Sequence, residues 1–274
     1  MNVINVLCRV VTLKVLLVAA PVWAEAPRLQ SIEDFFRRPL IESPRLSPDG
    51  KRIGMIVTTN EGRTVLAVAD IATPQKRIGI ARFGDGDVRS FRWVNDQRLV
   101  FDAIDFQAPL GEQFGAGLYA IDVDGGNFEF LVGRGCGFES QGHVAIRPLR
   151  WNHVFHRAVR DGSDDVLVLL HNLRYAHEPE STTPLRLNTR TRATRELVTD
   201  TPDHATGWVL DQTGVPRSAI STDLKGNARV MRRKSGTADW VEMDSYDIFD
   251  PKPGSFEPMA FDVDGSLIVA GIAQ

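Results

Sequence analysis

Cysteine is almost absent from this sequence, and its scarcity excludes a disulfide-based fold. The 274 residues contain two cysteines, Cys8 and Cys136. Cys8 lies in a segment with the pattern of a cleaved leader, so Cys136 would be the one cysteine of the mature chain and no internal disulfide could form. Cys136 stands in a glycine-rich stretch, residues 133–137, which indicates a small side chain in a loop rather than a nucleophile.

An excess of charge is also missing. Lysine and arginine number 32, aspartate and glutamate 35, and the net charge is −3 with the basic residues spread along the chain. This pattern argues against a nucleic-acid-binding patch and a polybasic membrane anchor, so we expect neither partner for the mature chain. A hydrophobic fraction of 43% and a charged fraction of 24% are those of an ordinary globular protein.

The apolar run at the N-terminus is too short to cross a membrane. Residues 15–20 follow Arg9 and Lys14, and they fall well below the ~20 apolar residues that a spanning helix needs. Together with the short residues around Val22 and Ala24, they are typical of a secretory signal peptide, with an uncleaved anchor as the alternative. We therefore expect a signal peptide at residues 1–24 and a periplasmic or secreted location.

Helical periodicity is rare in the remaining chain. Ser31 and Asp34 have the form of a capping box and predict a short helix through Arg37, which Pro39 ends. Beyond it, no stretch of about 12 residues has a 3.6-residue period, while short apolar runs separated by turn residues recur. The sequence thus predicts an N-terminal segment at residues 25–42 with one short helix, followed by an all-β body.

Two hairpin phrases alternate along this body. The first phrase, strand–turn–strand, begins at residues 44–57 and returns at 91–101, a period of 46 residues from Asp49 to Asn95. Weaker copies are assigned to residues 150–155, with Trp151 at the turn, and to 209–217 and 261–269. The second phrase lies between them at 64–78, 117–131 and 183–198, and a polar insertion is assigned to residues 171–182.

Two hairpins per repeat make four strands, which is the pattern of β-propeller blades. A β-sandwich also has short strands and regular turns, but it does not explain the alternation of two different hairpins at one period. We therefore predict that residues 43–274 form an incomplete β-propeller of about four four-stranded blades and a partial fifth.

Groups that could hold a metal ion are difficult to find. None of the six histidines has the spacing of a zinc site, and His153 and His156 fall on a predicted strand, where residues three apart point to opposite faces. Three Asp-Gly segments, at residues 85–87, 122–125 and 262–265, lack the ligand spacing of calcium loops and are interpreted as hairpin turns. The histidines are His143, His153, His156, His171, His177 and His204.

The nucleophile motif of serine hydrolases is missing as well. No G-x-S-x-G pentapeptide occurs, and the nearest segment, residues 137–143 around Ser140, has the wrong spacing and no following helix. We therefore predict no catalytic residue in this chain, Ser140 included, and we predict no cofactor-binding or metal-binding residue.

Several phrases resemble a known family. Residues 43–53, with Ser-Pro-Asp-Gly at 47–50, are similar to the first blade of the N-terminal propeller in bacterial prolyl oligopeptidase-type serine peptidases, of the acylaminoacyl-peptidase and dipeptidyl-peptidase branch. Residues 32–36, 207–211 and 256–261 and the leader resemble this branch too, so the similarity spans about residues 30–274. Propellers of the Tol-system translocation protein share the Ser-Pro-Asp-Gly phrase.

The resemblance implies a role without catalysis for these residues. In the peptidases the propeller restricts access to a C-terminal α/β-hydrolase domain that holds the catalytic serine, aspartate and histidine, and this sequence stops at Gln274 before any such domain. The first hypothesis is therefore the substrate-gating propeller of an exported serine peptidase, truncated before the hydrolase domain that would act on the peptide. The alternative is a periplasmic propeller that binds a protein partner through its loops.

The leader yields a direct test. Protein recovered from an exporting host is expected to begin at Glu25 or Pro27, because the small residues Ala24 and Ala26 are those after which a signal peptidase cuts. N-terminal sequencing of the periplasmic fraction measures this, and Met1 on exported material would contradict the prediction.

Overall fold

The computed structural model describes residues 37–109, 117–134, 148–175, 178–233 and 239–271, together with Ser31, Ile32 and Phe35. The chain divides into two compact units, Met1–Arg37 and Arg38–Gln274. In the first unit, Ile32 and Phe35 have helical backbone, while the predicted leader and the other residues of the predicted helix, apart from Arg37, lie outside the described residues.

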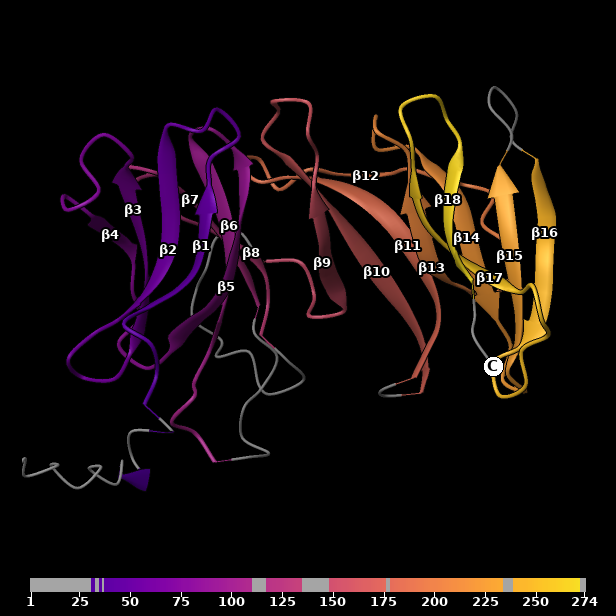
Figure 1. Ribbon diagram of the computed structural model, residues 1–274, viewed down its shortest axis with the longest axis horizontal. Coiled ribbons are helices and arrows are strands. Elements are labelled where there is room, and N and C mark those ends of the chain that lie inside the picture. The colour runs from indigo at the N-terminus through magenta and orange to yellow at the C-terminus, as the bar shows by residue number, and fades with distance from the viewer. Residues whose placement is uncertain are drawn as a thin grey trace, which may run out of the picture. The chain divides into compact units, whose positions relative to one another are not determined.

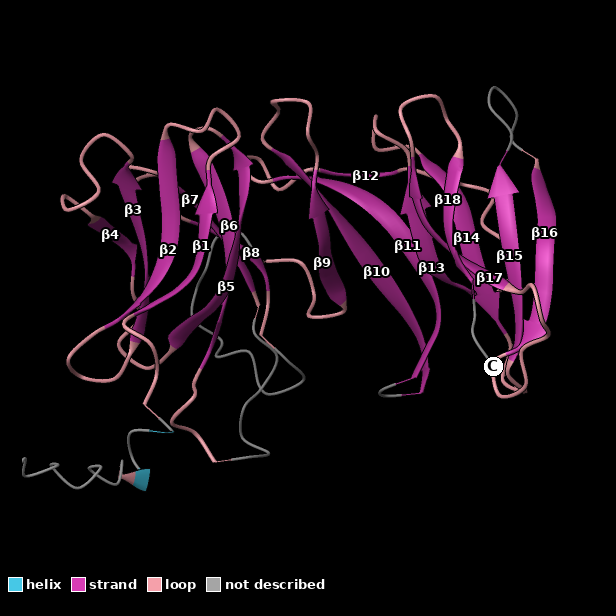
Figure 2. Cartoon of the chain, in the orientation of Figure 1, coloured by secondary structure: helices cyan, strands magenta, loops and turns pink. Residues whose placement is uncertain are grey.

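Four successive four-stranded antiparallel sheets and one two-stranded sheet make up the described part of the second unit (Figure 1, Figure 2). Within every sheet the strands are hydrogen-bonded in the order in which they occur along the chain. This up-and-down arrangement, repeated from sheet to sheet, is that of β-propeller blades. The prediction of an all-β propeller with four blades and a partial fifth is confirmed.

The strands have the following bounds. The first sheet contains β1 (Ile41–Leu46), β2 (Arg52–Thr58), β3 (Thr64–Asp70) and β4 (Ile78–Ala81), and the second contains β5 (Asp87–Asn95), β6 (Arg98–Ile104), β7 (Leu118–Asp122) and β8 (Glu129–Val132). The third contains β9 (His153–Ala158), β10 (Asp165–Tyr175), β11 (Glu178–Asn188) and β12 (Thr194–Glu196). The fourth contains β13 (Ala205–Leu210), β14 (Pro216–Thr222), β15 (Asn227–Arg233) and β16 (Trp240–Asp247), and β17 (Phe256–Phe261) pairs with β18 (Leu267–Gly271).

The turn between the first two strands of a sheet depends on glycine in four of the five sheets. Gly50, Gly162, Gly214 and Gly265 have φ values of 71°, 79°, 81° and 84°, in the left-handed region that glycine enters without steric cost. This regularity corrects the predicted third repeat. The turn lies at Asp161 and Gly162, whereas Trp151 precedes β9. Residues 150–152 are similar to the first phrase, but they contain no glycine with positive φ.

The insertion predicted at residues 171–182 takes the form of a longer hairpin. These residues extend β10 and β11, the longest strands described, and His171 is paired with Thr182 in their antiparallel register. Its residues are polar, because a hairpin that extends past its neighbours needs no apolar face. The second hairpin of the fourth sheet, β15 and β16, was not identified from the sequence.

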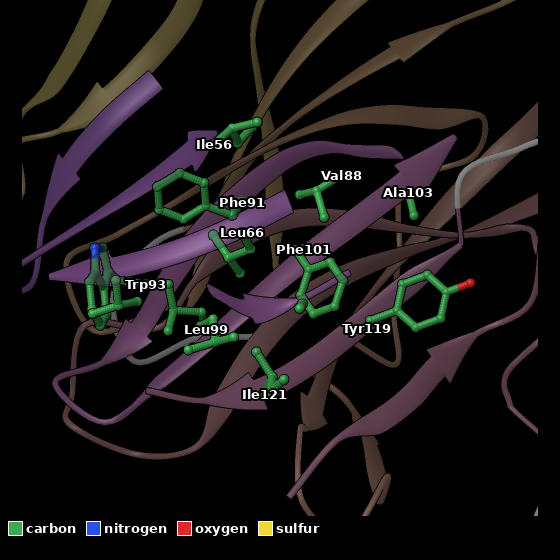
Figure 3. Close-up of a cluster of buried hydrophobic side chains, with 13 residues drawn as sticks. Ile56, Leu66, Val88, Phe91, Trp93, Leu99, Phe101, Ala103, Tyr119 and Ile121 are labelled. Atoms are coloured by element: carbon green, nitrogen blue, oxygen red, sulfur yellow. The ribbon is translucent and has the colours of Figure 1, made fainter. Parts of the chain in front are cut away.

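Separate hydrophobic clusters fill the spaces between neighbouring sheets. The first cluster joins sheets one and two and includes Leu66, Phe91 and Phe101 (Figure 3). Val100, the neighbour of Phe101 on β6, belongs instead to the cluster between sheets two and three. Successive side chains of a strand point to opposite faces of its sheet. Each inner sheet is apolar on both faces and therefore contributes side chains to two clusters.

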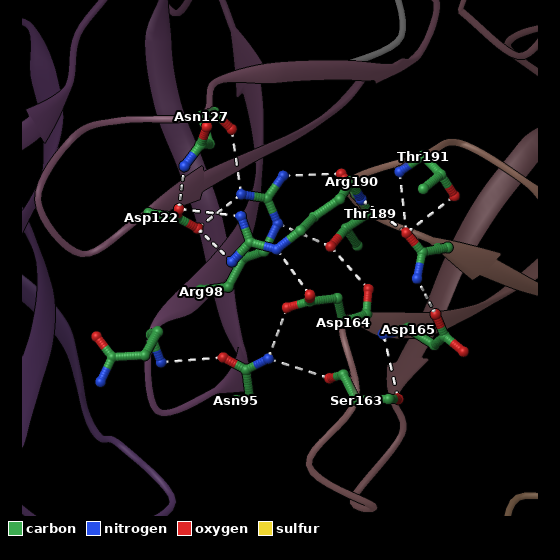
Figure 4. A network of polar contacts seen from close by, with 12 residues as sticks. Asn95, Arg98, Asp122, Asn127, Ser163, Asp164, Asp165, Thr189, Arg190 and Thr191 are labelled. Atoms are coloured by element: carbon green, nitrogen blue, oxygen red, sulfur yellow. Dashed lines mark hydrogen bonds and ion pairs between the residues drawn. The ribbon is translucent and has the colours of Figure 1, made fainter.

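A buried arginine connects the second and third sheets. Arg98, at the start of β6, is fully buried, and its guanidinium forms an ion pair of 2.7 Å with Asp122 (Figure 4). The same group donates to the hydroxyl and the carbonyl of Thr189, at 2.8 and 2.7 Å, just beyond β11. Burial opposes the charged form of Asp122, but hydrogen bonds from Arg190, Asn127 and Arg98 outweigh it and lower the pKa of that carboxyl.

A buried aspartate connects the first and second sheets through hydrogen bonds. The predicted hairpin turn at residues 85–87 is wrong, because these residues lead from β4 of the first sheet to β5 of the second. Asp87 is 1% exposed at the start of β5. It accepts hydrogen bonds from the Thr64 backbone at 2.8 Å, from Arg63 at 2.9 Å and from the Phe106 backbone at 3.1 Å. The carboxylate therefore holds the start of β3 against the next sheet.

Replacement of Arg98 should weaken the whole second unit. Arg98→Met would leave Asp122 without its buried partner and the Thr189 carbonyl without a donor, which typically costs about 3–5 kcal/mol. The control is Arg82→Met, because Arg82 and Glu61 are both about 70% exposed and such pairs contribute about 0–1 kcal/mol. Urea unfolding measures the free energy of unfolding of both variants. An equal decrease of this free energy in the two variants would contradict the role assigned to Arg98.

The close approach of sheets one and two at Gly54 can be tested in the same way. A Cβ atom at Gly54 on β2 would lie 2.7 Å from Cε2 of Phe91, inside the hydrophobic cluster. Gly54→Ala is expected to lower the free energy of unfolding by about 1–3 kcal/mol through overpacking. Gly79→Ala on β4 is the control, since nothing lies within 4 Å of its Cβ position. Unfolding midpoints that agree for the two variants would refute the steric argument.

Candidate binding cavity

The first strands of three successive sheets line a common cavity. Its volume is about 800 Å³, and its walls come from β1, β5, β9 and the turn that follows β13. Each first strand lies at the edge of its sheet and pairs with the second strand only. Backbone groups on the other side of these strands are therefore free of ladder hydrogen bonds within the described sheets.

Arginine dominates the charged part of this wall. Arg45, Arg92, Arg157 and Arg160 line the cavity, and Asp96 is the acidic residue beside them. Asp96 is already engaged, because its carboxylate accepts a hydrogen bond of 2.8 Å from the Asp49 backbone. The cavity is therefore basic in a chain whose net charge is −3.

Arg45 and Arg92 stand on β1 and β5 and line the same cavity. Partial burial of Arg92 lowers the pKa of its guanidinium, and repulsion from Arg45 lowers it further. Arg92 donates 2.7 Å to the carbonyl of Phe91, its own neighbour in sequence. No ion pair joins either arginine to a carboxylate among the described residues.

The guanidinium of Arg157, on β9, makes a single hydrogen bond among the described residues. Its Nη2 donates 2.9 Å to the carbonyl of Asp211, while its Nε is buried and has no hydrogen-bond partner among the described residues. Burial lowers the pKa of Arg157, and Arg160 lowers it further by repulsion. Burial, followed by repulsion from Arg157, also lowers the pKa of His156, so that the imidazole is neutral at pH 7.

The arginines occur at one repeated position. Arg45, Arg92 and Arg157 each stand four residues before an aspartate in the turn that follows, namely Asp49, Asp96 and Asp161. The sequence analysis missed this signal because the third repeat was aligned on Trp151. Arg45 and Arg157 each stand five residues before the left-handed glycine of their turn, Gly50 and Gly162, and in the fourth sheet the position five residues before Gly214 is Val209.

A smaller neighbouring cavity brings a serine, an aspartate and a histidine together. It has a volume of about 430 Å³, shares Arg92 and Phe155 with the larger cavity, and includes Ser90, Asp102 and His153 in its lining. These residues do not form a triad. Asp102 accepts from Arg89 and from the Ser90 backbone, and Nδ1 of His153 contacts the Arg150 carbonyl at 2.9 Å. No carboxylate orients the imidazole, so the described geometry lacks a base for serine activation.

The other residues considered in the sequence analysis have the following positions. His153 and His156 lie on β9 as predicted, and His171 lies on β10. Ser140, Cys136, His143 and His177 lie outside the described residues. The segments 122–125 and 262–265 are hairpin turns as predicted. Among the described residues, no group of three or more histidine, cysteine, aspartate or glutamate side chains is placed to hold a metal ion. No helix in the same residues has the length and hydropathy to cross a membrane.

Comparison with known proteins identifies similar solved structures only. No family model and no curated protein matches the sequence. An oligogalacturonate lyase in complex with manganese is 13% identical with a TM-score of 0.45, covering 84% of this chain and 58% of the lyase. A prolyl endopeptidase is 14% identical with a TM-score of 0.48, covering 84% of this chain and 32% of the peptidase. The Pyrococcus horikoshii acylaminoacyl peptidase is 13% identical with a TM-score of 0.46, covering 86% of this chain and 39% of the peptidase.

The chain therefore spans less than two thirds of the length of each of these proteins. Peptidases of the prolyl oligopeptidase type, which the sequence resembles, are among them, together with an oligogalacturonate lyase. At such identities the similarity concerns the fold and assigns no activity.

Proposed function

We propose that this chain is the non-catalytic propeller part of an exported serine peptidase and that its large cavity receives peptide substrates. The observation that carries the proposal is the cavity of about 800 Å³ lined by the edge strands β1, β5 and β9. A site built from edge strands suits an extended peptide, whose own backbone can supply the missing hydrogen bonds.

The wall of the cavity also suits peptide side chains. Leu46, Val94 and Phe155 line it beside the arginines, so apolar and charged positions alternate over a short distance. Leu46 is 59% exposed, which leaves apolar surface available for a ligand. Binding in this cavity would restrict entry to unfolded or extended chains, because a folded domain is far larger than the space.

Hydrolysis is assigned to a separate domain. Acyl transfer needs a nucleophile, a base within about 2.6–3.2 Å and an oxyanion hole in one place. The Asp102 carboxylate in the smaller cavity is bound to Arg89 and to the Ser90 backbone and does not contact His153. The described residues thus support binding, and the peptidase reaction belongs to the hydrolase domain implied by the resemblance.

Peptide binding and probe labelling test this function together. The chain is expected to bind unstructured peptides of about ten residues in fluorescence anisotropy and to remain unlabelled by a fluorophosphonate probe. Leu46→Trp should weaken peptide binding by narrowing the cavity, and it should fold because Leu46 is exposed.

The matched control is Leu224→Trp, since Leu224 is 81% exposed and does not line the cavity. Absence of peptide binding, or equal binding by the two variants, would refute the role of the cavity. Stoichiometric probe labelling would refute the non-catalytic assignment.

A further inference from the structure

We infer that the large cavity selects acidic peptide segments, whose carboxylates bind the arginines repeated on β1, β5 and β9. This inference rests on the proposed function, because it names the class of peptide that the cavity receives. It concerns Arg45, Arg92 and Arg157, which the repeat places at the same position of three consecutive first strands and which all line the cavity.

These three arginines lack the partners that other arginines of the chain have. Arg63, Arg98 and Arg186 form ion pairs with aspartates at 2.5 to 2.9 Å. Arg45 has no hydrogen-bond or ion-pair partner for its side chain among the described residues. Arg92 and Arg157 donate to backbone carbonyls only. Their charges are thus available to a ligand that brings carboxylates into the cavity.

The unbound cavity carries an electrostatic penalty. Burial lowers the pKa of Arg92 and of Arg157, repulsion from Arg45 and from Arg160 lowers each further, and attraction to Asp102 and to Asp211 offsets part of the effect. A carboxylate between such groups would remove this repulsion and gain charge-assisted hydrogen bonds.

The edge strands favour a peptide over another polyanion. β5 pairs only with β6, and β9 only with β10, so their remaining edges offer donors and acceptors at the spacing of an extended polypeptide. An acidic oligosaccharide could pair with the guanidinium groups, but it has no regular array of amides to match these edges.

Three fluorescein-labelled peptides of about ten residues test the inference. They share one backbone and carry glutamate, glutamine or lysine at alternate positions. At low salt and pH 7.5, the glutamate peptide should bind about tenfold or more tightly than the glutamine peptide, and the lysine peptide most weakly. The preference should shrink when salt is raised, because screening weakens the attraction.

Substitution of the arginines tests the location. Arg92→Gln and Arg157→Gln should each weaken glutamate-peptide binding about tenfold and leave glutamine-peptide binding nearly unchanged. Arg92→Lys keeps the charge but loses the planar fork, so it should retain part of the preference. Arg229→Gln is the control, since Arg229 is exposed on β15 and does not line the cavity. Urea unfolding midpoints confirm that each variant is folded.

The outcomes separate this inference from the function on which it rests. If no peptide binds, the proposed function fails. If all three peptides bind equally, or if Arg229→Gln has the effect of Arg92→Gln, the acidic selectivity fails while peptide binding stands. A uronic-acid oligomer that displaces the glutamate peptide more strongly than an unlabelled copy of that peptide would overturn the choice of a peptide ligand.

Discussion

The buried charge of Arg98 is the constraint on which the arrangement of the sheets depends. A guanidinium removed from water is costly unless every donor finds an acceptor. Asp122 provides one from its own sheet, and Thr189 provides two from the next. Because these acceptors belong to two sheets, the charge is satisfied only when the sheets stand in one register. A purely apolar contact would be less restrictive, since packing tolerates small shifts better than hydrogen-bond geometry does.

The cavity is a consequence of this register. The hydrophobic clusters occupy the faces between successive sheets and leave the edges of the first strands without partners. The hydrogen bonds of Asp87 fix the position of β5 relative to β3, and those of Arg98 fix the second sheet relative to the third. The side chains of Arg45, Arg92 and Arg157 then line one space, although 112 residues separate the first from the last.

Arginine thus has two physical roles in the same fold. Where acceptors are fixed by the protein, as around Arg98, the guanidinium contributes to the specificity of the structure. Where the side chain has only a backbone carbonyl as hydrogen-bond partner and another arginine lowers its pKa, as at Arg92, the charge remains available for a ligand. Composition does not separate these roles, because the 32 basic residues and 35 acidic residues nearly balance over the whole chain.

The sequence by itself determined the local elements. Apolar alternation and Asp-Gly turns predicted most of the hairpins, because strand periodicity and positive φ are properties of neighbouring residues. The same reasoning misplaced the third turn at Trp151, where a similar phrase lacks the glycine that the turn needs. It assigned an insertion to residues 171–182 without showing that these residues lengthen β10 and β11.

Only the tertiary structure decided which polar residues are buried and which line a site. Asp87 looked like a turn residue, yet it accepts hydrogen bonds from Arg63 and Thr64, on the preceding sheet. Arg98 meets Thr189 across 91 residues of sequence. The cavity arginines were overlooked for the same physical reason, since burial, pairing and repulsion depend on distances in space between residues that no local pattern relates.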